Sequence, residues 1–395
     1  MLTNCPDLRV RKSAAIALPL FGASVSTTTA DLGRREMFAE IRKLCSSDNT
    51  TNLFVLLREY AVLAAVIAGC VTAYHQILAS GASLLWMAPI YVLSIMIIGI
   101  WVQNRLGCLI HESSHYLLFK NRKVNDIVAN LFVAFPLFGV ISNYRIGHWG
   151  HHRHVNDPEK DPDLLRLAKH YPAKFPVSKA RFLWEYVLYQ LLTHQALSYL
   201  KGRAEYVAFM MKHKPVSGQD PLGKGFTWTL RISYYAVLLA VLIHFSWWPH
   251  FLLLWIVPMI TFYPATLYLR EIGHHGNYPD SGDFTNSRVY EGYWLEREIF
   301  FPFSEQNHVL HHMFPTLPWH KMRQGHEVMM RYAPYRESVV TCDGFFFKRH
   351  RDNDHPTVLD LLAAPSDRYL RTAENRDAAE IRSNTLDEVG GAVAQ

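Results

Sequence analysis

The sequence predicts an all-α membrane protein with about four transmembrane helices arranged as two hairpins, and with a cytoplasmic helical cap. Two long runs predict the membrane spans: no Asp, Glu, Lys or Arg occurs in the 45 residues of Tyr60–Asn104 or in the 38 residues of Ile232–Leu269. A bilayer-spanning helix needs about 20 largely apolar residues, so each run is long enough for two spans. The third observation is the 21 histidines, many of which cluster just outside these runs and predict the cap.

Composition excludes several other classes of protein. Only 19% of the 395 residues are charged, whereas a soluble domain usually carries about 25%. The net charge of +6 fits basic flanks on the cytoplasmic side of a membrane. No compact basic stretch with interleaved aromatic residues is present, so we expect no nucleic-acid partner. The five cysteines form no CxxC pair, which argues against a disulfide framework, a zinc ribbon and a rubredoxin-like iron centre.

Three regions are expected along the chain. Residues 1–50 form a cytoplasmic N-terminal segment, residues 51–330 form the membrane domain, and residues 331–395 form a cytoplasmic C-terminal region with a mobile tail. The first hairpin is expected at about 58–104 and the second at about 228–269. Gly and Ser residues in the first uncharged connector, and a proline in the second, predict where the two hairpins turn.

The region between the hairpins begins as a continuation of the second span. We expect that helix to run on through Leu106–Ile110 into the sequence HESSH at 111–115, just outside the hydrocarbon layer. The uncharged stretch Ile127–Tyr144 is interrupted by Pro136 and Gly139. We interpret it as a re-entrant or interfacial segment, because a further span would place the first two histidine clusters on opposite sides of the membrane.

The distribution of basic residues predicts the orientation. Both hairpin connectors lack Lys and Arg, whereas the other ends of the hairpins carry residues such as Arg58, Arg105, Lys224 and Arg270. Loops rich in Lys and Arg stay in the cytoplasm. We therefore expect a multi-pass integral membrane protein whose termini and histidine clusters face the cytoplasm.

Three histidine boxes have the spacing of metal ligands. They read HxxxH, HxxHH and HxxHH, and positions i, i+3 and i+4 of a helix share one face, so the imidazoles of each box can converge: His111 and His115; His148, His151 and His152; and His308, His311 and His312. A further pair, His274 and His275, follows the second hairpin, and we expect only one of the two to reach a common centre. Imidazole suits Zn, Cu, Fe and Ni. Eight or nine such donors exceed the need of one tetrahedral zinc and suit two irons with positions open for oxygen.

The order of these boxes resembles the membrane-bound fatty acid desaturase and hydroxylase superfamily. The resemblance covers roughly residues 50–330 and includes HHRHVNDPEKDPDL at 151–164, REIGHHG at 270–276 and NHVLHHMFPTLPWHKM at 307–322. His274 stands where the family usually has Glu. The resemblance implies a four-span, cytoplasm-facing di-iron oxidase that uses O2. It also implies the ligand set His111, His115, His148, His151, His152, His275, His308, His311 and His312.

Neighbouring polar residues are candidates for orienting these ligands. A ligand histidine usually gives its second N–H to a carboxylate or a carbonyl. The candidates lie close to the boxes in sequence: Glu112, His154, Asp157, Asp161, His274, Glu305 and Asn307. For each carboxylate and for Asn307, helix capping or ordinary surface charge is an equally good interpretation, and His154 is equally well interpreted as an exposed residue.

The expected activity is O2-dependent introduction of a double bond into a fatty acyl chain or a similar amphiphilic substrate. The sequence FPTLPW at 314–319 resembles desaturases more than alkane hydroxylases. The chain shows no GxGxxG after a strand, no cysteine cluster and no fused cytochrome-b5-like domain. Electrons must then come from a separate partner, either ferredoxin or a b-type cytochrome with its reductase.

Four alternatives remain open at this point. The chain could be a hydroxylase of the same superfamily, or a desaturase of a small amino-acid-derived metabolite, as the dihydrorhizobitoxine desaturases are. HESSH also matches the HExxH pattern of intramembrane zinc proteases, with Glu112 as general base, although that interpretation leaves both HxxHH boxes unexplained. A metal-binding membrane protein without catalytic activity is the last alternative.

Overall fold

The computed structural model describes residues 31–170, 175–189, 198, 201–202, 205, 220–277 and 282–364. The first 30 residues of the expected N-terminal segment and the expected mobile tail lie outside the described residues. The described part is mostly helical, with almost no sheet.

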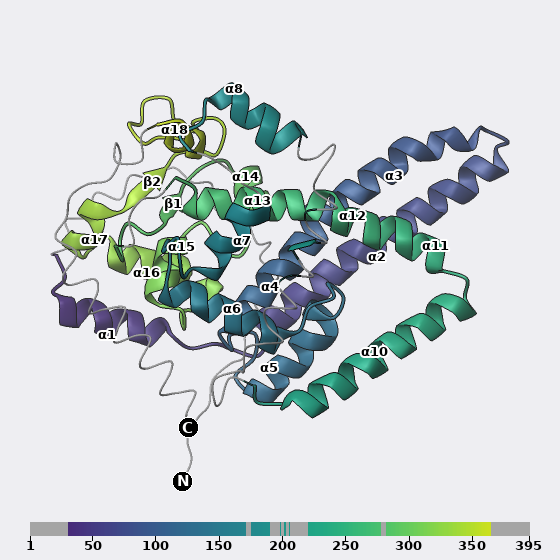
Figure 1. Ribbon diagram of the computed structural model, residues 1–395, viewed down its shortest axis with the longest axis horizontal. Coiled ribbons are helices and arrows are strands. Elements are labelled where there is room, and N and C mark those ends of the chain that lie inside the picture. Colours follow the sequence, from purple (N-terminus) through teal and green to yellow (C-terminus); the bar gives the residue numbers. More distant parts are fainter. Residues whose placement is uncertain are drawn as a thin grey trace, which may run out of the picture.

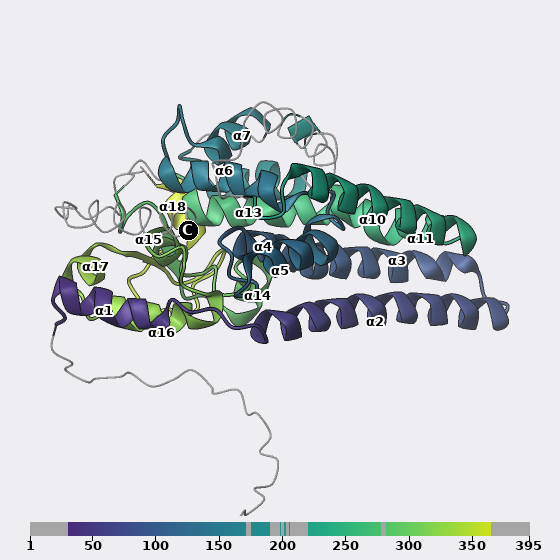
Figure 2. The same cartoon turned by 90° about the horizontal axis from the view of Figure 1, so that it is seen from below.

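Four helices in the described part are long and apolar enough to cross a membrane. They extend over Thr51–Ala79, Leu84–Ser114, Lys224–His244 and Trp248–His275. These helices extend beyond the expected hairpins at 58–104 and 228–269. The second and the fourth helix each continue past the apolar run and reach the histidines at 111 and at 274–275. Figure 2 shows these helices extending together to one side of the molecule and the remaining elements gathered at their other end.

The long helices are assembled from shorter labelled elements. The first is α2 and the third is α10, whereas the second joins η1, α3, η2 and α4 and the fourth joins α11, η6, α12 and α13. In chain order the helices are α1 (Arg34–Leu44), α2 (Thr51–Ala79), η1 (Leu84–Trp86), α3 (Met87–Met96), η2 (Ile97–Gln103), α4 (Asn104–Ser114), α5 (Arg122–Ala129), η3 (Asn130–Ala134), α6 (Ile141–Arg153), α7 (Pro162–His170), α8 (Lys179–Arg181), η4 (Phe182–Leu188), α10 (Lys224–His244), α11 (Trp248–Phe251), η6 (Leu252–Ile256), α12 (Val257–Ile260), α13 (Phe262–His275), α14 (Trp294–Phe300), α15 (His308–Met313), η7 (Trp319–Lys321), α16 (Met322–Met329), α17 (Ala333–Ser338) and α18 (Val358–Ala363).

The second and fourth long helices cross in close contact at two glycines. A Cβ at Gly99 would lie 2.8 Å from the Cβ of Phe262, and a Cβ at Gly107 would lie 2.9 Å from the hydroxyl of Tyr263. Small residues let helix backbones approach closely inside a membrane. This crossing brings α4 and α13, whose last turns carry His111 and the pair His274 and His275, to the same end of the bundle.

Helix α10 is much less embedded in the protein. Only 6% of its apolar window is buried, against 56% for the fourth long helix. Figure 1 shows α10 standing away from α2, with α11 at one of its ends and α5 near the other. Most of its side chains therefore face outward, as expected for a helix surrounded by lipid.

The segment Ile127–Tyr144 forms no span. It contains the end of α5, the turn of η3, a tight turn around Pro136 and the start of α6. This segment contains no single helix long enough to cross a membrane, and both flanking histidine boxes lie at the same end of the long helices, as expected for an interfacial or re-entrant segment.

The cap packs around its own apolar core. Met37 and Ile41 of α1 share this core with Leu310 and Met313 of α15 and with Met329 of α16. A parallel pair of short strands, β1 (Arg288–Tyr290) and β2 (Val340–Cys342), closes one side, with Val289 opposite Thr341. This small sheet is the exception to the all-α prediction. This core packs α15 against α1 and α16, and His311 of α15 contacts His152 of α6.

Candidate metal centre

Four helices carry the histidines to one place in the cap. His111 lies on the last turn of α4, and His115 follows its last residue. Helix α6 carries the second box, α13 ends in the pair His274 and His275, and α15 consists mostly of the third box. The expectation that the second long helix continues through Leu106–Ile110 into HESSH is therefore confirmed, and the helix ends at Ser114.

The nine histidines of the implied ligand set form two groups. In each group the candidate ligand atoms all lie within 4.8 Å of one another. The first histidine group is His111, His115, His148, His152 and His311. The second histidine group is His151, His275, His308 and His312.

The first histidine group brings its Nε2 atoms face to face. His115 Nε2 and His148 Nε2 are 2.8 Å apart, and His152 Nε2 lies 3.0 Å from His148 Nε2 and 2.9 Å from His311 Nε2. All five residues are buried. Nitrogen atoms this close, contributed by different helices, have the arrangement needed to surround a cation.

The protonation of these rings fits a metal ion. Burial lowers the pKa of the imidazoles of His115, His148, His152 and His311 well below the ordinary value, and charge on the neighbouring rings lowers it further. The rings are therefore neutral at pH 7, which is the form that binds metal. His111 Nε2 is also buried without a hydrogen-bond partner. An unpaired buried polar atom is costly unless a ligand satisfies it, so the residues present fit a metal.

Glu305 lies between the two groups. Its Oε1 is 2.8 Å from His111 Nδ1 and its Oε2 is 3.4 Å from His308 Nδ1. Burial alone would raise the pKa of the Glu305 carboxyl, but the adjacent His111 holds it well below its usual range. One buried carboxylate thus contacts one ring of each group.

The structure distinguishes His274 from His275. His275 belongs to the second histidine group, and its Nδ1 donates to the carbonyl of Asn286 at 3.1 Å. His274 instead stacks on His308, with ring centroids 3.8 Å apart, and its Nε2 donates to the carbonyl of Glu305. His274 also forms a smaller possible metal group with Glu305 and His308. The main contact of His274 is therefore with a candidate ligand.

Asp161 holds a ring of the second group. Both of its carboxylate oxygens lie 2.9 Å from His151 Nδ1, and the residue is 1% exposed. The backbone amides of Asn156 and Asp163 also donate to it. Asp161 thereby orients His151 and leaves Nε2 free for a ligand, as expected of a carboxylate behind a metal-bound histidine.

The remaining sequence candidates lie outside these contacts. The buried carboxylate of Glu112 accepts from the backbone N–H of Trp319 at 3.2 Å. Asp157 accepts from the amides of a turn at Glu159 and Lys160. His154 and Asn307 contribute their backbones to the end of α6 and the start of α15, and no side-chain bond from either to a clustered histidine occurs in the described part.

Sequence analysis missed a buried ion pair that joins the first two boxes. Arg145 of α6 donates to both carboxylate oxygens of Asp126, at 3.0 and 2.7 Å, and both side chains are fully buried. Arg145 Nε also donates to the carbonyl of Ser114 at the end of α4. The pair therefore fixes α6 relative to α4. The available signal was a pair of opposite charges, Asp126 and Arg145, at the two ends of the uncharged stretch 127–144.

A small cleft reaches both groups. Its volume is about 60 Å³, and it is lined by residues that include His111 and His148 of the first group and His151 and His308 of the second. It has room for molecules of the size of water or O2.

Comparisons with known proteins agree with this arrangement. The family model "Fatty acid desaturase" matches residues 84–343. Dihydrorhizobitoxine desaturase of Bradyrhizobium elkanii is 28% identical over 323 residues, which cover 78% of this chain and 84% of that protein. The Delta(5) fatty acid desaturase fat-4 of Caenorhabditis elegans is 26% identical over 65% of this chain and 61% of its own length. Beta-carotene 4-ketolase 3 of Haematococcus lacustris is 29% identical over 22% of this chain and 27% of its own length.

Proposed function

Because this chain belongs to the fatty acid desaturase family, we propose that it is an O2-dependent, membrane-bound di-iron desaturase. It introduces a carbon–carbon double bond into a fatty acyl chain or a similar amphiphilic substrate. The observation that carries the proposal is the pair of buried histidine groups in contact through Glu305. The family consists of oxidoreductases, so the zinc-protease alternative is set aside.

The nine histidines are proposed to hold two irons, one in each group. Five rings of the first group and four of the second supply imidazole nitrogen donors, which suit iron. When bound, the two irons would supply the activation of O2 that removes hydrogen from two adjacent carbons and reduces oxygen to water. Glu305 and Asp161 keep His111 and His151 oriented, and their burial keeps bulk water away from the ring nitrogens.

We propose the same membrane topology that the sequence predicts. The four long helices form two hairpins within residues 51–330, and residues 1–50 and 331–395 lie in the cytoplasm with the histidine groups. The basic residues at these helix ends support that orientation. They also suit an acidic electron carrier, either ferredoxin or a b-type cytochrome with its reductase, through electrostatic steering.

A second candidate substrate has specific support. The dihydrorhizobitoxine desaturase of Bradyrhizobium elkanii, whose match covers 78% of this chain, acts on dihydrorhizobitoxine, as its name states. A small amino-acid-derived metabolite is therefore the alternative to a fatty acyl chain. Hydroxylation is the alternative outcome at the same metal centre.

Metal analysis followed by product analysis tests the proposal. Protein purified in detergent should contain about two irons per chain. Incubation with O2, a reduced ferredoxin and membrane lipids should give acyl chains lighter by two hydrogens in mass spectrometry. One zinc and no iron would contradict the di-iron assignment. Iron-loaded protein that converts only amino-acid-derived compounds would select the second candidate, and an added oxygen atom would select hydroxylation.

A further inference from the structure

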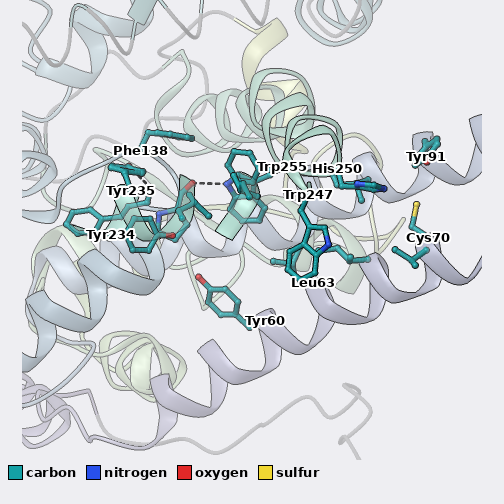
Figure 3. Close-up of a pocket in the computed structure, with 18 of the residues that line it drawn as sticks. Tyr60, Leu63, Cys70, Tyr91, Phe138, Tyr234, Tyr235, Trp247, His250 and Trp255 are labelled. Carbon is teal, nitrogen blue, oxygen red and sulfur yellow. Dashed lines mark hydrogen bonds between the residues drawn. The ribbon is translucent and has the colours of Figure 1, made fainter. Parts of the chain in front are cut away.

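A cavity unrelated to the histidine groups lies between α10 and the other long helices. Its volume is about 680 Å³, which is within the range of about 300–1,000 Å³ typical of small-molecule sites. Figure 3 shows side chains from α2, α10 and the segment Trp247–Trp255 around it. It shares no lining residue with the cleft at the metal centre.

The wall of this cavity is suited to hydrocarbon. None of the lining residues is Asp, Glu, Lys or Arg. Three of its aromatic residues bond their polar atoms to the backbone: Tyr60 Oη donates to the Phe132 carbonyl, Tyr235 Oη to the Phe135 carbonyl, and Trp255 Nε1 to the Pro136 carbonyl, the last at 2.8 Å. Ring faces and aliphatic groups make up most of the wall, so the occupant is apolar over most of its length.

The shape indicates an extended chain. Lining residues on α2 run from Tyr60 to His75, which is about 22 Å along a helix that crosses the membrane. In Figure 3 the cavity extends from Tyr235 and Phe138 at one end to Tyr91 and Cys70 at the other. It thus runs parallel to the long helices and to the acyl chains of a bilayer, and a compact ligand would leave much of it unfilled.

One end of the cavity carries a positive charge. Arg231 of α10 lies with its Cζ 5.7 Å from the ring of Tyr235 and donates to the carbonyl of Phe138. Within the described ranges, its contacts are this carbonyl and two aromatic rings, with no ion pair. Arg231 immediately precedes the uncharged run that begins at Ile232, so it lies at the level of the lipid headgroups.

We propose that this cavity binds one anionic membrane phospholipid. An acyl chain fills the space behind α10, and the phosphate lies at Arg231. The lipid joins α10 to the other three long helices, which explains how a helix with so little protein contact keeps its position. This inference goes beyond the proposed function and requires only that the long helices cross a bilayer.

Filling the cavity tests the proposal. Leu238 lines the cavity, whereas its neighbour Leu239 is 58% exposed on the outer face of α10. The two variants to compare are therefore Leu238→Trp and Leu239→Trp, each purified, stripped of lipid and mixed with phosphatidylglycerol or with phosphatidylcholine. Native mass spectrometry counts the lipids that remain bound. We expect one phosphatidylglycerol on the wild type, about tenfold less on Leu238→Trp, and no change on Leu239→Trp.

The charge is tested separately. Arg231→Gln should remove the preference for phosphatidylglycerol over phosphatidylcholine. Arg231→Lys, which keeps the positive charge, should keep that preference. Equal helix content by circular dichroism and equal elution in size-exclusion chromatography in all variants report an intact fold. Equal phosphatidylglycerol retention by the two Trp variants would overturn the proposal. A retained fatty acid or sterol in place of a phospholipid, or the absence of retained lipid on the wild type, would also overturn it.

Discussion

The two histidine groups differ in what holds their rings. In the first group, helix packing sets most positions: the Arg145–Asp126 pair fixes α6 against α4, the Nδ1 atoms of His115 and His152 are buried without an acceptor, and His111 contacts a carboxylate, that of Glu305. In the second group, Asp161 lies behind His151 and the Asn286 carbonyl behind His275, whereas the Nδ1 atoms of His308 and His312 are buried without a hydrogen bond. The first group should therefore depend more on helix packing and the second more on single side chains, and four experiments probe that difference.

The largest effect is expected from removing a ligand. His152→Ala deletes the ring that lies between His148 and His311, and His312→Ala removes a ring of the second group. Each variant should lose about one metal per chain and all measurable activity, because C–H oxidation has no residual route without the metal. Elemental analysis and product assay measure both. His154→Ala is the matched control, and a similar loss there would contradict the assignment.

The next effect is on stability and concerns the first group. Arg145→Met leaves Asp126 buried without its partner, which typically costs about 3–5 kcal/mol. We expect a lower midpoint of thermal unfolding and loss of metal from the first group. Arg153→Met, at an exposed position of the same helix, should change stability by less than about 0.5 kcal/mol. Equal effects of the two variants would show that the ion pair does not fix α6.

A smaller and more selective effect is expected in the second group. Asp161→Asn keeps the size of the side chain but removes the charge behind His151. Loss of such an outer partner typically lowers metal affinity by about 10–100-fold. Metal titration should show weakened binding at one site per chain and unchanged binding at the other. Asp163→Asn is the control, and weakening at both sites would mean that Asp161 acts on the whole centre.

The smallest effect is a difference in pH dependence. Burial alone would lower the pKa of His151, but the bond and charge of Asp161 outweigh it and raise that pKa. Metal must displace the proton, so affinity at the second group should fall as pH drops through this raised value. Four rings of the first group, those of His115, His148, His152 and His311, have lowered pKa values, so the first group should hold metal to lower pH. Cobalt titrations followed by absorbance measure both sites.

The same titration on Asp161→Asn sharpens the test. Asn cannot stabilise the imidazolium, so the affinity of the second group for cobalt, although weaker at high pH, should begin to fall at a lower pH than in the wild type. Simultaneous loss from both groups in the wild type would remove the proposed distinction between them.

Local patterns were sufficient to predict much of this centre. The spacing of the boxes and the apolar runs predicted the helices that carry the histidines and the non-spanning segment after α5. Spacing also predicted that rings on one helix face converge. The choice of His275 over His274 followed from the resemblance, and the structure places His275 among the clustered rings.

The partners of these rings were harder to predict because they depend on contacts between distant residues. Asp157 and Asp161 look alike in sequence, since both precede a proline, yet only Asp161 reaches a ring. The acceptor for His275 is a backbone carbonyl at Asn286, which no side-chain pattern reveals. Arg145 and Asp126 are 19 residues apart, and their pairing depends on how α5 and α6 fold back on each other.

The close crossing at Gly99 has a consequence for how this sequence can change over generations. Any side chain larger than hydrogen there would push the fourth long helix away and separate the ends that carry His111 and His275. Along the outer face of α10, by contrast, one apolar residue can replace another without disturbing a neighbour. Homologous chains should therefore keep glycine at the crossing but vary among apolar residues at positions such as Val237 and Leu239. Substitutions should accumulate much faster on the outer face of α10 than at the crossing, although the two helices have similar compositions.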